Sequence, residues 1–333
     1  MRICVLGAGG LGSIFGGYCA REGADVTLIG RKAHVDAINA NGLKITGVQG
    51  EHLVKNITAV ESADQAQGDF DYLIFGVKGK DNESAVAGAA SLKGRVGAAC
   101  SFQNSVIKEQ LLSDWLGAEQ VIGFATIEAG NLAGPGEANH NFTIPQSTYF
   151  GEMDGSSSQR VQKIVDLCNA AKIGTKAVNN IEQVIWEKVT QIANAAGWSV
   201  SAMAGVRELT MADGMVVQEG AEHYVQYARE LIAVYKALGY QPENFFAPVS
   251  RLKELDSGTF EQAVQTVMQI GEGMRKNQYK GRTSMHEDVV RGRKTEVDFT
   301  IRPFVDKGEE LGVEIPTVKA VYRIIKVLDS YLA

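Results

Sequence analysis

Short apolar runs alternate with amphipathic segments along the first half of the chain. Such runs are predicted to be strands covered on both faces, because they are too short for helices and lack helical spacing. They fall at residues 2–6, 25–29, 71–77, 95–101, 120–125 and 174–178. Between the first two runs, Ile14, Phe15, Tyr18 and Cys19 recur at helical spacing. This alternation predicts an α/β fold with a doubly wound, mostly parallel sheet of the Rossmann type.

The second half of the chain has a different pattern. Long segments at 221–238, 260–274 and 316–332 carry apolar residues at helical spacing, and Pro316 suits the first turn of the last one. We therefore predict two domains, a Rossmann-type domain at 1–180 and an all-helical C-terminal domain at 181–333.

A glycine-rich motif lies between the first strand and the first helix. Gly7, Gly9 and Gly12 form GxGxxG in the strand–turn–helix context that dinucleotide binding requires. Gly7 would permit the tight turn, Gly9 the approach of a pyrophosphate, and Gly12 close packing of helix and strand. The helix N-terminus would offer free N–H groups to the phosphate. We assign cofactor binding to Gly7, Gly9, Gly10, Leu11 and Gly12.

The end of the second strand indicates which dinucleotide binds. NAD-dependent enzymes usually place Asp or Glu there, to accept from the ribose 2′-hydroxyl. This chain has Gly30, Arg31 and Lys32 instead. A guanidinium can hold a 2′-phosphate through charge-assisted hydrogen bonds. We therefore predict NADP(H), with Arg31 as the main contact; the alternative is a solvated start to the next helix.

Composition narrows the class of protein. Lys and Arg number 33 against 39 Asp and Glu, a net charge of −6 that argues against a general nucleic-acid binder. No apolar run approaches the roughly 20 residues of a membrane helix, and the N-terminus does not resemble a signal peptide. The four cysteines form no CxxC pair. These features predict a cytoplasmic protein with reduced thiols.

Several strings along the chain are informative when taken in order. They are GAGGLGSIFG at 7–16, IGR at 29–31, GVKGKD at 76–81, SFQNSV at 101–106, GPGEANH at 134–140, WEK at 186–188, NAAGWSVSAMAG at 194–205 and TSMHEDVVRGRKTEVD at 283–298. Together they resemble the ketopantoate reductase (2-dehydropantoate 2-reductase) family. The resemblance implies NADPH-dependent reduction of a small-molecule 2-oxo acid to a D-2-hydroxy acid. Ketopantoate is then the expected substrate, in pantothenate and coenzyme A biosynthesis.

The resemblance also implies roles for individual residues. Lys188 falls at the catalytic lysine, whose ammonium could stabilise the developing oxyanion and donate the proton. Glu296 matches a catalytic glutamate that accepts from the substrate hydroxyl. Ser284 matches a serine that binds the substrate carboxylate, although it could instead cap a helix beginning near Met285.

Two further polar residues follow predicted strand ends, where ligands bind in open α/β sheets. The resemblance places Lys78 and Asn104 near the nicotinamide and the substrate, and Asn104 and Glu296 are also expected to contact the cofactor. His140 is interpreted as a structural or rim residue. The histidines form no metal-binding pattern, so no metal is predicted.

The chain departs from the family after Lys188. The family has asparagines four and eight residues after its lysine, on one helix face. Counting from Lys188 gives Ile192 and Ala196, whereas aligning on NAAGWSVSA gives Asn194 and Trp198. We favour the second register and assign Asn194 and Trp198 to substrate binding. It requires a local distortion of the helix, which Gly197 would permit.

Either register removes a polar partner for ketopantoate, so two alternatives stay open. One is a D-2-hydroxy-acid dehydrogenase of the same family that acts on a bulkier branched or aromatic 2-oxo acid. The other is a non-catalytic NADP(H)-binding regulatory protein. A homodimer is compatible with an apolar face on the helical domain, but no feature of the sequence requires one.

Overall fold

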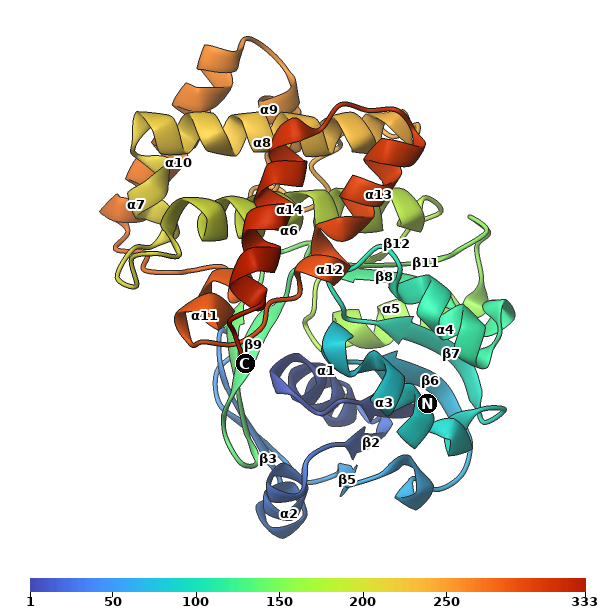
Figure 1. The fold of residues 1–333 in the computed structure, drawn as a ribbon. Helices are drawn as coiled ribbons and strands as arrows, with labels where there is room; N and C mark the ends of the chain where they lie inside the picture. The colour runs from blue at the N-terminus through green and yellow to red at the C-terminus, as the bar shows by residue number, and fades with distance from the viewer. The chain divides into compact units, whose positions relative to one another are not determined.

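The computed structural model describes all residues from 1 to 333, and the chain divides into two compact units (Figure 1). The first unit contains residues 1–103 and 107–185, and the second contains residues 104–106 and 186–333. The long helix α6 (Ile181–Met203) begins in the first unit and continues in the second. The short segment 104–106 lies between two parts of the first unit in sequence, but it packs with the second, helical unit.

The first unit is built on a five-stranded parallel sheet in the order β5-β2-β1-β6-β7. Its strands are β1 (Arg2–Leu6), β2 (Asp25–Ile29), β5 (Thr58–Val60), β6 (Phe70–Phe75) and β7 (Val96–Ser101). Helix α1 (Gly10–Arg21) connects β1 to β2, and α2 (Lys32–Asn41) follows β2. The strand–helix–strand alternation in the sequence thus forms the parallel sheet that it predicts, and the fold class is confirmed.

Alternate residues of the strands face two separate cores. In β1, Ile3 and Val5 pack on the side of α1 and α5 (Gln159–Ala170), while Cys4 and Leu6 face the other side. The second core contains Leu112, from α4 (Lys108–Leu116). Because both faces are covered, the strands are apolar throughout, and this explains why they read as continuous apolar runs.

Two smaller sheets complete the first unit. One has the order β4-β3-β10-β9 and the other β12-β11-β8. Their strands are β3 (Leu43–Gly47), β4 (His52–Val54), β8 (Ile122–Thr126), β9 (Ala129–Gly134), β10 (Glu137–Phe142), β11 (Thr148–Glu152) and β12 (Thr175–Ala177). The four-stranded sheet packs close against α1, because a Cβ added at Gly10 would lie 2.5 Å from the Cα of Asn131.

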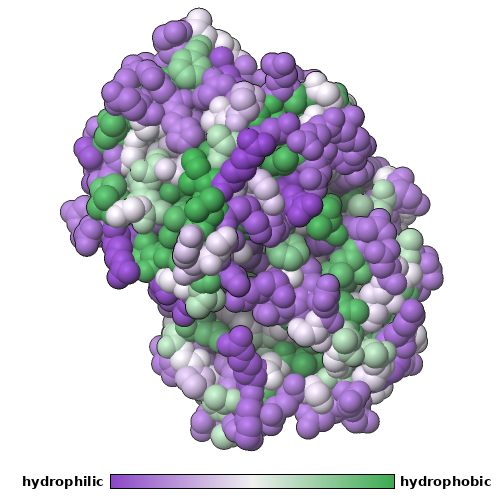
Figure 2. Space-filling view, in the orientation of Figure 1, coloured by the Kyte–Doolittle hydropathy of each residue, from purple (hydrophilic) through white to green (hydrophobic).

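The second unit is entirely helical. After α6 come α7 (Met211–Met215), α8 (Gln218–Ala237), α9 (Leu252–Asp256), α10 (Phe260–Lys276), α11 (Ser284–Val290), α12 (Val297–Thr300), α13 (Arg302–Glu310) and α14 (Pro316–Asp329). The all-helical character of this part is confirmed. No helix combines the length and apolar character that crossing a membrane would need. Hydrophilic residues cover much of the face seen in Figure 2, with smaller hydrophobic patches between them.

Candidate functional site

The glycine-rich turn after β1 has the geometry of a phosphate cradle. Gly7 has φ +106°, and a Cβ there would lie 2.7 Å from the carbonyl carbon of Gly76, so only glycine fits. A Cβ at Gly12 would lie 2.4 Å from the oxygen of Gly7. A Cβ at Gly9, in contrast, would meet no atom within 4 Å. Gly7 and Gly12 are therefore required by the protein itself, whereas the open space at Gly9 suits an approaching ligand.

The first turn of α1 leaves donors available at this cradle. Gly9 is the N-cap and supplies no side-chain hydrogen bond, and no acidic residue lies in the first turn. The N–H groups of Gly10, Leu11 and Gly12 have no acceptor within the protein. Free N–H groups at a helix N-terminus favour an anion, and the dipole of the helix adds to this preference. The residues present therefore fit a dinucleotide pyrophosphate.

The two cations after β2 have different surroundings. Lys32 is bound to Asp36 at 3.1 Å and lies 3.5 Å from Glu61. Arg31 is exposed, and its side chain makes no hydrogen bond or ion pair within the protein. Its guanidinium therefore remains available to an external phosphate.

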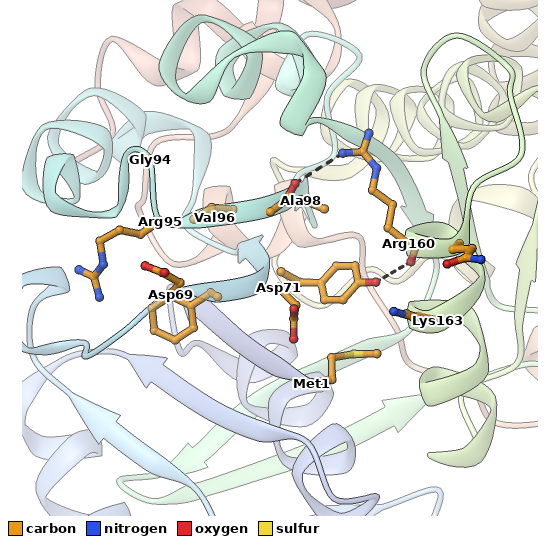
Figure 3. Close-up of a pocket in the computed structure, with 13 residues that line it drawn as sticks. Met1, Asp69, Asp71, Gly94, Arg95, Val96, Ala98, Arg160 and Lys163 are labelled. Atoms are coloured by element: carbon orange, nitrogen blue, oxygen red, sulfur yellow. Dashed lines mark hydrogen bonds between the residues drawn. The ribbon is translucent and has the colours of Figure 1, made fainter.

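Lys78 follows β6 at the carboxyl edge of the parallel sheet, and its side chain is exposed. A hollow of about 800 Å³ lies at the opposite edge, around the starts of β6 and β7 (Figure 3). It is lined by residues such as Asp69, Arg95 and Lys163. Since ligands of open α/β sheets bind at the carboxyl ends of strands, this hollow is not the cofactor site.

The helical unit carries a second cluster of polar groups. The Nζ of Lys188, on α6, donates to the Oδ1 of Asn104 at 2.9 Å. Asn104 and Lys188 belong to the same unit, because segment 104–106 packs with the helices. Lys188 is 4% exposed, so its ammonium lies in an environment where its hydrogen bonds are strong.

The three residues of the WEK string point in three directions, as the 100° turn per helical residue requires. Trp186 packs edge-on against Phe304, with ring centroids 5.4 Å apart. Glu187 is fully buried and accepts the backbone N–H groups of Glu243 and Phe245, at 2.6 and 2.7 Å. Burial raises the pKa of Glu187. Trp186 and Glu187 thus anchor α6, whereas Lys188 bonds Asn104.

A pocket beside Lys188 contains the remaining polar residues of this cluster. Its lining includes Asn104, Ser284 and Glu296. Thr283, not Ser284, is the N-cap of α11, since its side chain accepts from the N–H of His286. The hydroxyl of Ser284 makes no hydrogen bond within the protein and is available to a ligand. The alternative in which Ser284 caps the helix is therefore wrong.

The structure contradicts the register that we favoured on α6. The helix is regular over its 23 residues, so Lys188 and Asn194 lie about 120° apart around its axis. Asn194 is 1% exposed and packs beside Tyr224. The indole N–H of Trp198 donates to the oxygen of Gly220 at 2.8 Å, and its ring is fully buried. Neither residue lines the pocket.

The expected distortion near Gly197 is also absent. A Cβ there would lie 2.4 Å from the hydroxyl oxygen of Tyr227, so this glycine lets α8 approach α6. Ile192 and Ala196, the residues of the other register, line the pocket instead. Counting helical turns from Lys188 therefore identifies the residues on the pocket side of α6 better than aligning the string that begins at Asn194.

Two polar residues of the pocket are not among the site residues expected from the sequence. Asp288 and Thr300 line it, each one helical turn after a residue that is among them. Asp288 follows Ser284, and Thr300 follows Glu296. The hydroxyl of Thr300 donates to the carbonyl oxygen of Asn104 at 3.2 Å. The spacing of four residues is the pattern that could have found both.

His140 lies in the core of the first unit. It is fully buried, and its Nδ1 lies 3.2 Å from the hydroxyl of Tyr18. Its Nε2 contacts the carboxylate of Glu128. These contacts favour a structural role over a place on the rim.

Two family models and several relatives match this chain along most of its length. Residues 3–155 match the family model described as ketopantoate reductase PanE/ApbA, and residues 180–329 match the model of its C-terminal part. A 2-dehydropantoate 2-reductase of Archaeoglobus fulgidus is 28% identical over 331 residues, covering 99% of both chains. One of Pyrococcus abyssi is also 28% identical, over 98% of this chain and 97% of the relative.

Solved structures of similar fold include two kinds of protein. A 2-dehydropantoate 2-reductase from Geobacter metallireducens has a TM-score of 0.81 at 21% identity, covering 98% of this chain and 99% of its own. A D-mandelate dehydrogenase with NADH and anilino(oxo)acetate has a TM-score of 0.76 at 18% identity, covering 99% of both chains. The two family models together span most of the sequence, including both the cradle and the helical pocket. The chain belongs to the ketopantoate reductase PanE/ApbA family of oxidoreductases.

Proposed function

We propose that this protein reduces a 2-oxo acid to a D-2-hydroxy acid with NADPH, and that ketopantoate is its substrate. The observation that carries the proposal is the pocket of the helical unit, where Lys188 is bonded to Asn104 and where Glu296 and Ser284 are also found. Relatives that match along nearly the whole chain are 2-dehydropantoate 2-reductases, which supports the choice of substrate.

Each residue of the pocket has a chemical task in this reaction. The nicotinamide, when bound, supplies the hydride. Lys188 donates a hydrogen bond to the ketone oxygen, stabilises the charge that develops there and delivers the proton. Asn104 holds the ammonium through its Oδ1, which fixes the direction of the donated proton.

The other two polar residues bind the substrate. Ser284 donates to its carboxylate with a hydroxyl that no protein group occupies. Glu296 accepts from the hydroxyl group of the substrate, because an ionised carboxylate can only accept. A 2-oxo acid bound in this way presents its carbonyl to Lys188 in one orientation.

Ile192 and Ala196 favour a second candidate. Both line the pocket, and neither can hydrogen-bond the hydroxyl of ketopantoate. An apolar wall suits a branched or aromatic substituent on the 2-oxo acid. The second candidate is therefore a D-2-hydroxy-acid dehydrogenase with a bulkier substrate.

A panel of 2-oxo acids tests both candidates. The rate of NADPH oxidation would be measured with ketopantoate and with branched and aromatic 2-oxo acids, and NADH would replace NADPH in a parallel series. We expect ketopantoate to have the highest kcat/KM and NADPH to be preferred. If a bulky 2-oxo acid exceeds ketopantoate by about tenfold, equivalent to ~1.4 kcal/mol, the second candidate replaces the first.

A further inference from the structure

Glu296 lies in a segment whose backbone is fixed by the last helix of the chain. The carboxylate of Asp329, at the end of α14, accepts the N–H of Thr295 and its hydroxyl, both at 2.9 Å. Asp329 and Thr295 are each 8% exposed. A buried carboxylate that accepts two hydrogen bonds from one residue constrains that residue strongly.

The constraint extends to both sides of Glu296. The hydroxyl of Thr295 also accepts the N–H of Val297 at 3.3 Å. The carbonyl oxygen of Glu296 accepts the N–H groups of Phe299 and Thr300, each at 3.0 Å. The peptide groups before, at and after Glu296 are therefore all held.

The same segment leads back to Lys188. The N–H of Thr300 donates to the carbonyl oxygen of Glu296, which fixes the position of Thr300. The hydroxyl of Thr300 donates to the carbonyl oxygen of Asn104. Asn104 in turn accepts from Lys188. Hydrogen bonds, together with the covalent link between Thr295 and Glu296, thus connect Asp329 to the groups assigned to the reaction.

A second tie between α14 and this segment is weaker. Asp298 accepts from the hydroxyl of Tyr322 at 2.8 Å and from Lys326 at 2.7 Å. The side chains of Lys326 and Asp298 are 42% and 38% exposed, and solvent reduces the value of such pairs. Asp329 is therefore the anchor on which the segment depends most.

We propose that Asp329 is a positioning residue, which acts on the reduction of the substrate by holding Glu296 through Thr295. The proposal rests on the proposed function, since it assigns Asp329 a task in that same site. It makes α14, which contributes no residue to the pocket lining, part of the catalytic apparatus.

The chain offers a matched control at the other end of α14. Glu230 is a buried carboxylate that accepts the hydroxyl of Thr317 and, at 3.0 Å, the N–H of Val318. It thus makes the same two kinds of bond as Asp329, and its partners lie outside the Glu296 segment. Glu230→Gln and Asp329→Asn should weaken the packing of α14 in similar ways.

The test is a double-mutant cycle with Glu296→Gln. We expect Asp329→Asn to lower kcat about tenfold in the otherwise unchanged enzyme, and less than about twofold when Glu296 is already Gln. Glu230→Gln should change kcat less than about twofold in either background. Equal losses from Asp329→Asn in both backgrounds, or equal losses from the two carboxylate substitutions, would overturn the proposal.

Two additions keep the test decisive. If Asp329→Asn does not fold, Thr295→Val takes its place in the cycle; it removes the two hydrogen bonds of the hydroxyl, to Asp329 and from Val297, and keeps the bond from the backbone N–H of Thr295 to Asp329. Amide hydrogen exchange of residues 294–301 is measured in each variant, and it should be faster in Asp329→Asn but not in Glu230→Gln. If the unchanged protein reduces no 2-oxo acid, the proposed function fails, and unchanged exchange in this segment separately overturns the positioning role.

Discussion

At the scale of single residues, the contrast between Arg31 and Lys32 gives a direct test of cofactor choice. Arg31 is free, whereas Lys32 is bound to Asp36 and lies near Glu61. Arg31→Ala should raise KM for NADPH about tenfold to a hundredfold, the value of a charge-assisted hydrogen bond, and leave KM for NADH unchanged. Lys32→Ala is the control. Equal effects of the two substitutions would remove Arg31 from recognition of the 2′-phosphate.

Ile192 tests which substituent the pocket prefers. Ile192→Asn places an amide one helical turn after Lys188, on the face that lines the pocket. This change should raise kcat/KM for ketopantoate and lower it for a branched aliphatic 2-oxo acid, so that their ratio shifts by about tenfold or more. Gln191→Asn is a control on the same helix, since Gln191 does not line the pocket. A ratio that does not move would exclude Ile192 from substrate selection.

At the scale of elements, two glycines of the β1–α1 turn should have different roles, Gly12 in the stability of the fold and Gly9 in ligand binding. Gly12→Ala should reduce the free energy of unfolding by ~1–3 kcal/mol, because its Cβ would overlap the backbone of Gly7. Gly9→Ala has room for its Cβ and should unfold like the unchanged protein, within ~0.5 kcal/mol. Titration should show its Kd for NADPH raised about tenfold, or ~1.4 kcal/mol. Tight NADPH binding by Gly9→Ala would argue against the cradle.

His34 on α2 connects three elements and predicts a dependence on pH. Its Nδ1 accepts the N–H of Gly136 at 2.9 Å, and its Nε2 lies 3.0 Å from the hydroxyl of Ser13. Burial lowers the pKa of His34 from its ordinary value of 6.5. The unfolded chain therefore takes up a proton first as the pH falls through about 6.5, and the folded state loses stability there. An NMR titration should place the pKa of His34 below 6.5; a value above it would contradict these contacts.

How far the sequence predicts these elements depends on the range of the contacts that define them. The parallel strands and the turn at Gly7 are defined by local patterns, and the prediction of both is confirmed. Strand β9 is mostly exposed and carries no apolar alternation, so only its pairing with β10, which itself pairs with the distant β3, reveals it. Local sequence patterns carry no information about pairing between strands that are distant in the chain.

The error on α6 has a similar cause. Matching the string after Asn194 required a distortion at Gly197, but the close approach of Tyr227 already accounts for that glycine. Tyr227 lies on another helix, so the local sequence could not show this contact. The regular phase of the helix from Lys188 would have identified the pocket face correctly.

At the scale of the whole molecule, the two units divide the chemistry. The first presents a glycine-rich turn with free N–H groups and a free guanidinium, and the second presents a buried ammonium bonded to Asn104, beside a pocket lined by further polar groups. The order of the matching motifs along the chain predicted this division, because each motif carries its own local chemistry. The matching motifs alone did not show that the apolar residues beside Lys188 line the pocket.

The most direct test of the central claim is the rate of ketopantoate reduction by Lys188→Ala at saturating NADPH. Loss of a positioned proton donor should lower kcat by about a hundredfold or more, since general acid catalysis contributes about 10²–10⁴. The Kd for NADPH, measured by fluorescence, should stay unchanged, because the cradle lies in the other unit. A kcat equal to that of the unchanged enzyme would show that Lys188 does not act on the substrate.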